Sequence, residues 1–488
     1  MTAGLWMLGI LALLLILTGL PAWVALLGVA LVFATGGVLA GDFPLALLSA
    51  IPGRLLGLLE NDLLQALPLY VLMGALLNHL PLARALFRTG SRGLNATGAG
   101  APLAGLGLGL LLAPMNGSVG ASVATLARTV LPRLREGGLS TERSAALVCV
   151  ASTFGVVVPP SLVLILLSDA MMRAHTEAVN ATGIAARIIN TQDLFIGALV
   201  PAALLLALYV CIAWQTSRRA ARHALPPSPS RRERIAAVIT GFLVLALLAS
   251  VTLGYLYAVE AAAAGGVALL AYGILSRALA RNALREVLRD TMMISGALFA
   301  LLVAATVFTS VLRDFGTDRW VAAALAGLPG GPPVLLAMVL GCLALCALVL
   351  DAFEIIFVII PVLMPPVLMR IGDATLVAVL ALMILQVSFL APPFGYAVLM
   401  VRSAAREAIS LKGLTRSLRP YLSAQVLVLA AVLAWPSLLW HRDAPDGKFG
   451  NSATTPTDEQ TRMLQQQLDR NADEVPPFGS NPLDAPRH

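Results

Sequence analysis

Apolar runs long enough to cross a lipid bilayer recur along this chain from Leu5 almost to Trp440. Only 12% of the 488 residues are charged, whereas an average soluble domain has about 25%. An open sheet would leave backbone polar groups unpaired in lipid, so such runs must span as helices. The sequence therefore predicts an all-α polytopic membrane protein. Its first apolar run is expected to be a retained span and not a cleaved signal.

Residue types that carry common enzyme chemistry are scattered along the chain. The five histidines and four cysteines have no metal-ligand spacing, and neither an HExxH helix nor a GxxxxGK[ST] phosphate loop occurs. The formal charge of +7 comes from basic residues in short segments between spans, which does not favour nucleic-acid binding. We therefore expect no resident cofactor, no structural or catalytic metal and no enzyme activity.

The apolar pattern predicts ten crossings and two re-entrant hairpins. The crossings lie near residues 5–20, 22–39, 65–80, 144–170 (interrupted), 194–214, 235–256, 258–275, 291–311, 375–401 (interrupted) and 422–440. Two further apolar blocks, 97–134 and 333–369, each contain two half-length helices around a polar break. A half-length helix cannot cross about 30 Å of hydrocarbon. Each block is therefore predicted to enter and leave the bilayer on one side.

Basic segments between the spans give the orientation. Residues 84–92, 216–234, 276–290 and 402–419 all have an excess of arginine and lysine, and the positive-inside rule places such segments in the cytoplasm. Both termini then lie outside, and the tail 441–488 is expected to be disordered. In the alternative, the C-terminus is cytoplasmic and one hairpin is a true crossing.

A shift of 233 residues brings the two halves of the chain into register. The proline pair of "FGVVVPPS" then falls on that of "FLAPPFGY", and Ser118 falls on Asp351. Each half has five crossings, and an odd number inverts the second half relative to the first, as in inverted-repeat secondary transporters. The predicted domains are 1–215 (first repeat), 216–234 (basic cytoplasmic linker), 235–440 (second repeat) and 441–488 (tail).

The polar breaks in the predicted membrane segments are suited to binding ions. In lipid, irregular backbone survives only where it is buried in protein or lines a cavity. A half-helix that begins at a break points its N–H groups at the membrane interior, which favours an anion. Proline removes helix donors and leaves carbonyl oxygens for a dehydrated cation. We therefore predict one cation site in each half, with the substrate between the two hairpin tips.

The predicted site consists of two groups of residues. The predicted ion-binding residues are Asn116, Gly117, Ser118, Ser152, Thr153, Gly155, Val158, Asp351, Ser388, Ala391 and Gly395. The predicted substrate-bordering residues are Ser122, Pro159, Pro160, Glu354, Gln386, Pro392 and Pro393.

Some of these residues also fit purely structural roles. Asp351 and Glu354 have the spacing of a helix capping box, and Ser118 is a good N-cap. Gln386 suits either a substrate contact or a hydrogen bond between helices. A cap and a cation ligand can also be the same residue, so both roles stay open at this point.

Four stretches of the chain carry a resemblance to a known family. They are "APMNGSVGASVATLARTVLPRLREGG", "STFGVVVPPSLVLILLSDA", "DAFEIIFVIIPVLMP" and "LAPPFGYAVLMVR". In this order and spacing they resemble the large membrane subunit of tripartite ATP-independent periplasmic (TRAP) transporters. The resemblance implies an elevator-type carrier in the bacterial inner membrane, driven by a gradient of sodium ions or protons. The hairpin tips and the interrupted spans would bind the ions and border the substrate.

The resemblance also implies partners. A periplasmic binding protein would deliver an organic acid, and a small four-helix membrane subunit, expected as a separate polypeptide, would complete the complex. The "DAFE" stretch is similar to the branch labelled for mannitol, chloroaromatic or dicarboxylic compounds, and the segment 171–192 is longer than the family implies. That segment either docks the binding protein or is an idle loop.

Three other functions remain as alternatives. The nearest is a stand-alone dicarboxylate/sodium symporter or an ion antiporter of related fold. An integral membrane enzyme and a passive membrane scaffold belong to different classes. The scaffold alternative predicts that both polar breaks tolerate filling with leucine.

Overall fold

The computed structural model describes residues 2–41, 49, 51–116, 118–183, 189–217, 228–327, 329–405 and 408–439, all within one compact unit, Met1–Arg442. Helices are the only regular secondary structure in this part of the chain. Gly117, most of the linker 216–234 and the tail 441–488 lie outside the described residues. The predictions made for them, and the predicted domain boundaries, stay predictions.

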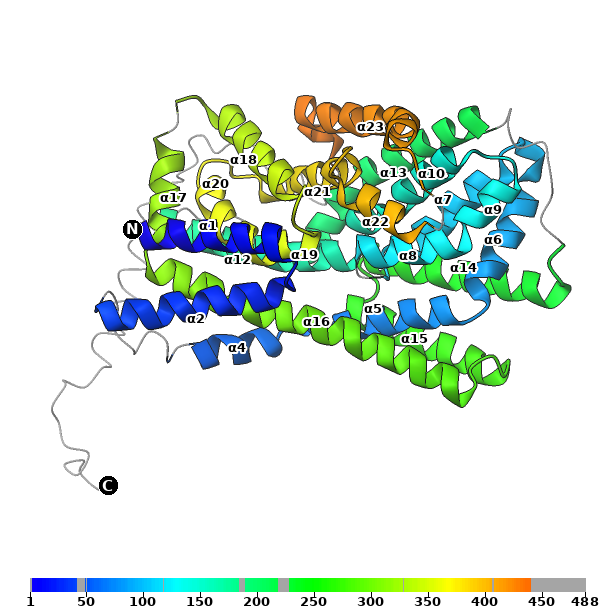
Figure 1. The fold of residues 1–488 in the computed structure, drawn as a ribbon, viewed down its shortest axis with the longest axis horizontal. Coiled ribbons are helices and arrows are strands. Elements are labelled where there is room, and N and C mark those ends of the chain that lie inside the picture. Colours follow the sequence, from blue (N-terminus) through cyan, green and yellow to red (C-terminus); the bar gives the residue numbers. More distant parts are fainter. Residues whose placement is uncertain are drawn as a thin grey trace, which may run out of the picture. The chain divides into compact units, whose positions relative to one another are not determined.

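Helices occupy every predicted span (Figure 1). In chain order the elements are α1 (Thr2–Thr18), α2 (Ala22–Ala40), α4 (Ile51–Leu59), α5 (Asp62–His79), α6 (Leu82–Gly93), the 3-10 turn η1 (Asn95–Thr97), α7 (Gly100–Leu112), α8 (Val119–Thr129), α9 (Leu131–Glu136), α10 (Thr141–Ser152), α11 (Phe154–Val157), α12 (Leu162–Thr182), α13 (Thr191–Ser217), α14 (Arg231–Thr252), α15 (Ala258–Leu275), α16 (Arg281–Asp314), α17 (Thr317–Ala326), α18 (Pro332–Cys346), α19 (Ala352–Glu354), the π-helical segment η2 (Ile355–Ile359), α20 (Ile360–Leu368), α21 (Ala374–Leu390), α22 (Tyr396–Ala404), α23 (Leu411–Ala434) and the 3-10 turn η3 (Pro436–Leu438).

The number of long helices fits the predicted crossings. Among the described residues, seven helices are long and apolar enough to cross a bilayer, and the bent pair formed by α5 and α6 makes an eighth if it is one span. The two remaining predicted crossings are α1, which has 17 residues, and the interrupted pair α21 and α22. The chain is a multi-pass helical protein, as the sequence predicts.

Helices in the two hairpin blocks are too short to cross a bilayer. α7 has 13 residues and α18 has 15, which gives axial lengths of about 20 and 23 Å against about 30 Å of hydrocarbon. After each break the chain starts a new helix, at Val119 in the first block and at Ala352 in the second. Both blocks therefore have the half-helix architecture that the sequence predicts.

Helix boundaries repeat at the predicted interval of 233 residues. α8 starts at Val119 and α19 at Ala352 (119 + 233 = 352), and α10 starts at Thr141 and α21 at Ala374 (141 + 233 = 374). The peptide bonds Pro159–Pro160 and Pro392–Pro393 are both cis. The two halves therefore share one structural plan.

Helix packing repeats in the same way. α10 packs against α7 as α21 packs against α18, and α12 packs against α20 as α22 packs against α8. The side-chain amide of Gln386 donates a 3.3 Å hydrogen bond to the hydroxyl of Thr153, its equivalent in the first half (153 + 233 = 386). A contact between equivalent residues places them on the pseudo-two-fold axis that relates the halves.

The equivalent helices α13 and α23 run antiparallel. The ring of Tyr209, in the second half of α13, lies 5.6 Å from the ring of Tyr421, in the first half of α23. Near the start of α13, a Cβ built on Gly197 would lie 3.8 Å from the side chain of Leu439, which follows α23. Opposite directions of equivalent helices are what an inverted repeat requires.

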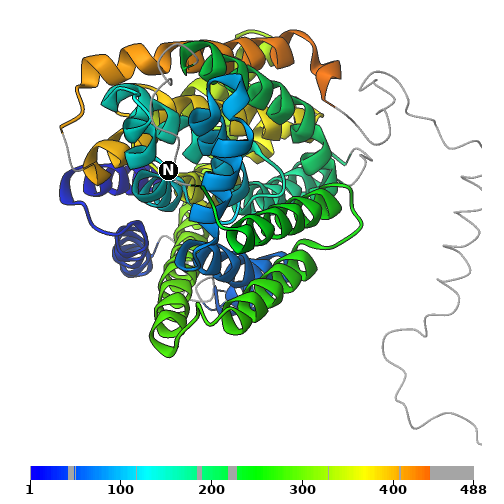
Figure 2. The ribbon, with the colours of Figure 1, turned by 90° about the vertical axis from the view of Figure 1, so that its right-hand side faces the viewer.

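A second group of helices lies on one side of the repeat core. α2 packs along α16, and α5 packs against both α15 and α16. In Figures 1 and 2 the green helices α14, α15 and α16 lie on the side opposite to the orange helix α23. α6 joins the two groups because it packs against both α7 and α14.

Three helices and one helix extension did not emerge from the sequence. The basic segment 84–92 lies in helix α6, in which Leu82 and Phe87 are buried while Arg84 is exposed, and α4 and α17 are also additional short helices. The segment 171–192 is no simple loop, because α12 continues to Thr182 and ends at Gly183, whose φ of 66° suits glycine. The arginines of α6 made its sequence look like a connecting segment, although its apolar residues follow the pattern of an amphipathic helix.

Close packing of the first hairpin against the first interrupted span gives a stability prediction. A Cβ on Gly155 would lie 2.4 Å from the carbonyl oxygen of Ala113. Gly155→Ala should therefore lower stability by about 1–3 kcal/mol through overpacking, seen as a lower midpoint of thermal unfolding. The matched control is Gly107→Ala in α7, where an added Cβ meets nothing within 4 Å. Equal midpoints for the two variants would contradict the packing.

Candidate functional site

The tip of the first hairpin is a compact hydrogen-bonded turn. Ser118 caps α8, because its hydroxyl accepts a 3.1 Å hydrogen bond from the N–H of Ala121. The hydroxyl of Ser122 donates to the carbonyl of Ser118 at 3.1 Å, and the amide of Asn116 donates to the Ser122 hydroxyl at 3.4 Å. Asn116, Ser118 and Ser122 therefore meet at the N-terminus of α8, as predicted. Gly117 lies outside the described residues.

Helix α5 holds this tip, which the sequence did not reveal. The side-chain amide of Asn78 donates a 3.0 Å hydrogen bond to the side-chain carbonyl of Asn116. One turn earlier, a Cβ on Gly74 would lie only 2.8 Å from the carbonyl oxygen of Met115. Glycine is needed there for the backbone of the tip to approach α5. An asparagine inside an apolar span was the available signal.

The tip of the second hairpin is acidic. Asp351 and Glu354 form a capping box, in which Asp351 Oδ1 accepts from the N–H of Ala352 at 2.8 Å and Glu354 Oε2 accepts from the N–H of Asp351 at 3.0 Å. The structural role that the spacing allowed is therefore present. A carboxylate has more lone pairs than the capping box uses, so the capping role is compatible with a cation beside them.

The first interrupted span docks on the first tip. The N–H of Leu162, the first residue of α12, donates to the carbonyl of Pro114 at 3.4 Å, and Gly155 packs on Ala113. The hydroxyls of Ser152 and Thr153 donate to helix carbonyls at 2.7 and 2.9 Å. The remaining predicted residues of this break are Val158, which is half-buried, and Pro159 and Pro160, which are buried.

The second interrupted span is more open than the first. The hydroxyl of Ser388 donates to the carbonyl of Ile384 at 2.9 Å, and the N–H of Gly395 donates to the carbonyl of Ala391 at 2.7 Å. Pro392 is half-buried and Pro393 is exposed, in contrast to their buried equivalents in the first half. The two predicted sites are thus related by symmetry but differ in burial.

Tyr396 lies at the first hairpin tip and was missed by the sequence reasoning. Its hydroxyl oxygen lies 3.0 Å from the position that a Cβ on Gly120 would take, beside the start of α8. Helix α22, which begins at Tyr396, packs against α8. The second interrupted span therefore contributes a polar side chain to the N-terminus of the first half-helix.

Gln386 contributes an unused acceptor at the centre of the molecule. The hydroxyl hydrogen of Thr153 is donated to Val150, so Thr153 Oγ1 can only accept from Gln386 Nε2. That contact fixes the amide orientation and leaves Gln386 Oε1 buried without a partner in the described part of the chain. A buried hydrogen-bond acceptor that has no donor requires an explanation. A bound cation or a donor on a substrate would supply one.

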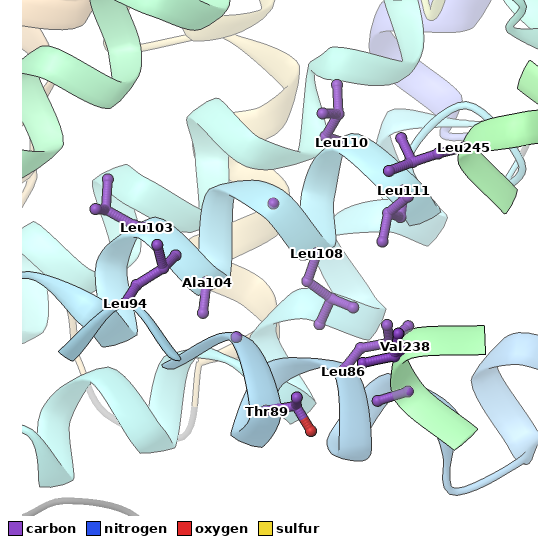
Figure 3. A pocket seen from close by; sticks show the side chains of 13 residues that line it. Leu86, Thr89, Leu94, Leu103, Ala104, Leu108, Leu110, Leu111, Val238 and Leu245 are labelled. Atoms are coloured by element: carbon purple, nitrogen blue, oxygen red, sulfur yellow. The ribbon is translucent and has the colours of Figure 1, made fainter. Parts of the chain in front are cut away.

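The chemistry of the site is that of oxygen ligands. Within the described residues no group of three or more histidine, cysteine or acidic side chains could hold a metal ion. Two cavities lie elsewhere, one lined by Asp169, Glu177 and Arg313 at the end of α12, and one between α6, α7 and α14 (Figure 3). Helix N-termini, hydroxyls, amide oxygens and a carboxylate pair suit an alkali cation beside an anion.

The fold and the site together define a class of protein. The chain has two inverted halves, and each half has a half-helix hairpin with a polar N-terminus and an interrupted span. This is the architecture of secondary transporters.

Sequence comparison gives the family. The profile described as Tripartite ATP-independent periplasmic transporter, DctM component, matches residues 8–438. The chain belongs to this family, so it is the large permease subunit of a TRAP transporter, a multi-pass membrane protein of secondary transport and not an enzyme.

Individual relatives are distant but cover most of the chain. The chain is 23% identical over 389 residues to the sialic acid TRAP transporter large permease protein SiaM of Vibrio cholerae, covering 78% of this chain and 86% of that protein. It is 24% identical to the C4-dicarboxylate TRAP transporter large permease protein DctM of Pseudomonas aeruginosa, with the same coverage of 78% and 86%. The crystal structure of the Alcanivorax borkumensis YdaH transporter aligns with a TM-score of 0.59 at 18% identity, over 81% of this chain and 89% of that chain. That structure supports the fold alone.

The position of Tyr396 gives a prediction for the site. Tyr396→Phe removes only the hydroxyl beside the start of α8, so we expect weaker substrate binding, measured as a KM raised about tenfold with little change in protein yield. Tyr209→Phe is the matched control, because its buried hydroxyl has no partner among the described residues and its ring packs against Tyr421 on α23. If both variants have the wild-type KM, Tyr396 does not border the substrate.

Proposed function

We propose that this chain imports a small organic acid across the bacterial inner membrane, driven by a sodium gradient. The observation that carries the proposal is a half-helix N-terminus in each half of the chain, one capped by Ser118 with Tyr396 beside it and the other capped by the carboxylates of Asp351 and Glu354. Helix N-termini favour an anionic group, and carboxylate and carbonyl oxygens favour a dehydrated cation. The relatives SiaM and DctM are named for sialic acid and C4-dicarboxylates, which are both organic acids.

Coupling would arise from the order of binding. A cation at Asp351 or Ser118 neutralises and orders a hairpin tip, and only then does the anion find a well-formed site between the tips. By linkage, the anion strengthens cation binding by the same factor. Asn78 and Gly74 would hold the first tip against α5, which belongs to the second group of helices.

Alternating access would move the two interrupted spans and the hairpins against that second group. Several polar contacts cross this boundary. Arg313 on α16 contacts Glu177 on α12 at 3.0 Å and also donates to the carbonyl of Pro361 on α20 at 3.0 Å. Such contacts must break and reform in an elevator cycle, so the conformation described here is one of at least two.

The partners belong to the same proposal. A periplasmic binding protein delivers the acid, and a small four-helix membrane subunit holds the second group of helices in the bilayer. Both termini of this chain then lie on the periplasmic side, where the segment 171–192 is placed to meet the binding protein. A requirement for these partners would distinguish this function from that of the stand-alone symporter.

Reconstituted uptake tests the function. The chain and its co-purifying small subunit are placed in proteoliposomes with the binding protein, and uptake of labelled succinate, sialic acid and isethionate is measured. We expect uptake of at least one acid with an inward sodium gradient, and none when potassium replaces sodium. Uptake driven by a pH gradient alone would assign the coupling to protons. Uptake without the binding protein would favour the symporter.

The role of Asp351 is tested with variants that distinguish its helix-capping hydrogen bond from its negative charge. Asparagine caps helices as well as aspartate does, so Asp351→Asn keeps the cap and removes the charge. We expect it to abolish sodium-driven uptake with an unchanged midpoint of thermal unfolding, whereas Asp351→Ala should also lose about 1 kcal/mol of stability. Asp373→Asn is the control, since Asp373 caps α21 through a 2.9 Å hydrogen bond with Leu376. Full uptake by Asp351→Asn would reduce the residue to a cap.

A further inference from the structure

A groove between α6, α7 and α14 has no role in the proposed transport cycle. Its cavity is about 320 Å³, and Figure 3 shows leucines from all three helices around it. Thr89 carries the one polar side chain among its lining residues. Val238 and Leu245 are 60% and 49% exposed, so the groove opens on the surface that faces lipid.

One end of the groove is basic. Gly241 on α14 lies beside Leu86 on α6, whereas Glu233 near the start of α14 lies 3.6 Å from Arg88 on α6. These two contacts place α6 beside the first half of α14. The exposed arginines close to these contacts are Arg92 on α6 and Arg231, Arg232 and Arg234 on α14.

An aromatic side chain marks a membrane interface near Leu94, which lines the groove. Trp214 donates its indole N–H to the carbonyl of Thr97 at 3.0 Å, and Thr97 follows Leu94, which lines the groove. Trp214 is 37% exposed. Tryptophan collects at the level of lipid headgroups, so the arginines lie where a phosphate would lie and the leucines where an acyl chain would lie.

Charge favours a lipid over an apolar helix as the occupant. An anionic headgroup would complement the exposed arginines, and its acyl chain would lie against the apolar lining of the groove.

We propose that this groove binds an anionic phospholipid, with one acyl chain between α6, α7 and α14 and the phosphate at Arg92, Arg231 and Arg234. The lipid then bridges the first hairpin, through α7, to α6 and α14 in the rest of the protein. Basic sites between membrane helices are suited to anionic headgroups. The proposal does not depend on which organic acid is transported.

Lipid retention tests the proposal on the full chain with any co-purifying subunit. The protein in detergent is mixed with equal amounts of phosphatidylglycerol and phosphatidylcholine, re-isolated by gel filtration, and its bound lipid is counted by mass spectrometry. We expect at least fivefold more phosphatidylglycerol than phosphatidylcholine on the wild type. Each of Arg92→Gln, Arg231→Gln and Arg234→Gln should lower this ratio, by up to about fivefold. Arg281→Gln and Arg285→Gln, at the start of α16, are the controls.

A second pair of variants tests the acyl-chain site. Gly107 lines the groove and a Cβ there meets nothing within 4 Å, so Gly107→Leu fills the groove without a clash at the backbone. It should lose about one lipid per chain, whereas Gly296→Leu, on an exposed and equally open face of α16, should lose none. If Gly107→Leu does not fold, the three arginine-to-glutamine variants still test whether the groove binds an anionic lipid.

Three outcomes would overturn the proposal. They are equal retention of both lipids by the wild type, an unchanged lipid count in a folded Gly107→Leu protein, and a disulfide between Gly107→Cys and a cysteine in the small subunit. The last result would identify the occupant as a protein helix.

Discussion

Backbone groups that leave a helix inside a membrane must find other partners, and this requirement shapes the whole molecule. Three of the four breaks are closed by a short polar side chain: Ser118 caps α8, Asp351 caps α19 and Ser161 caps α12. The first interrupted span also rests on the first hairpin, because the N–H of Leu162 donates to the carbonyl of Pro114. Hydrogen bonds made between the breaks, and not apolar packing alone, therefore hold the site in the interior of the protein.

Symmetry brings these breaks together at one place. Because the halves are inverted copies, equivalent residues such as Thr153 and Gln386 meet on the axis between them. Tyr396 of the second half lies beside Gly120 at the first hairpin tip. The proposed transport site between the halves would thus follow from the repeat, with its residues drawn from segments far apart in the sequence.

Local pattern and the internal repeat were sufficient to predict the fold. The shift of 233 residues, seen first in prolines, also places the starts of α8 and α19, and the spacing of Asp351 and Glu354 predicted their capping box. Contacts that depend on tertiary packing could not be predicted from the sequence. Asn78 and Tyr396 became visible as site residues only when α5 and α22 were placed against the hairpins. Helices α6 and α17 were missed because their charged faces resemble those of connecting segments.

The two halves share a plan but not a chemistry. Ser118 in the first half stands where Asp351 stands in the second, and the buried Pro160 corresponds to the exposed Pro393. Identical halves would make the inward-open and outward-open forms isoenergetic, because exchanging the conformations of the halves would return the same molecule. With a neutral cap in one half and an acidic cap in the other, that degeneracy is lifted. In the proposed cycle the empty permease would therefore favour one side of the membrane, and the serine-for-aspartate difference is one of the sequence differences that contribute to this preference.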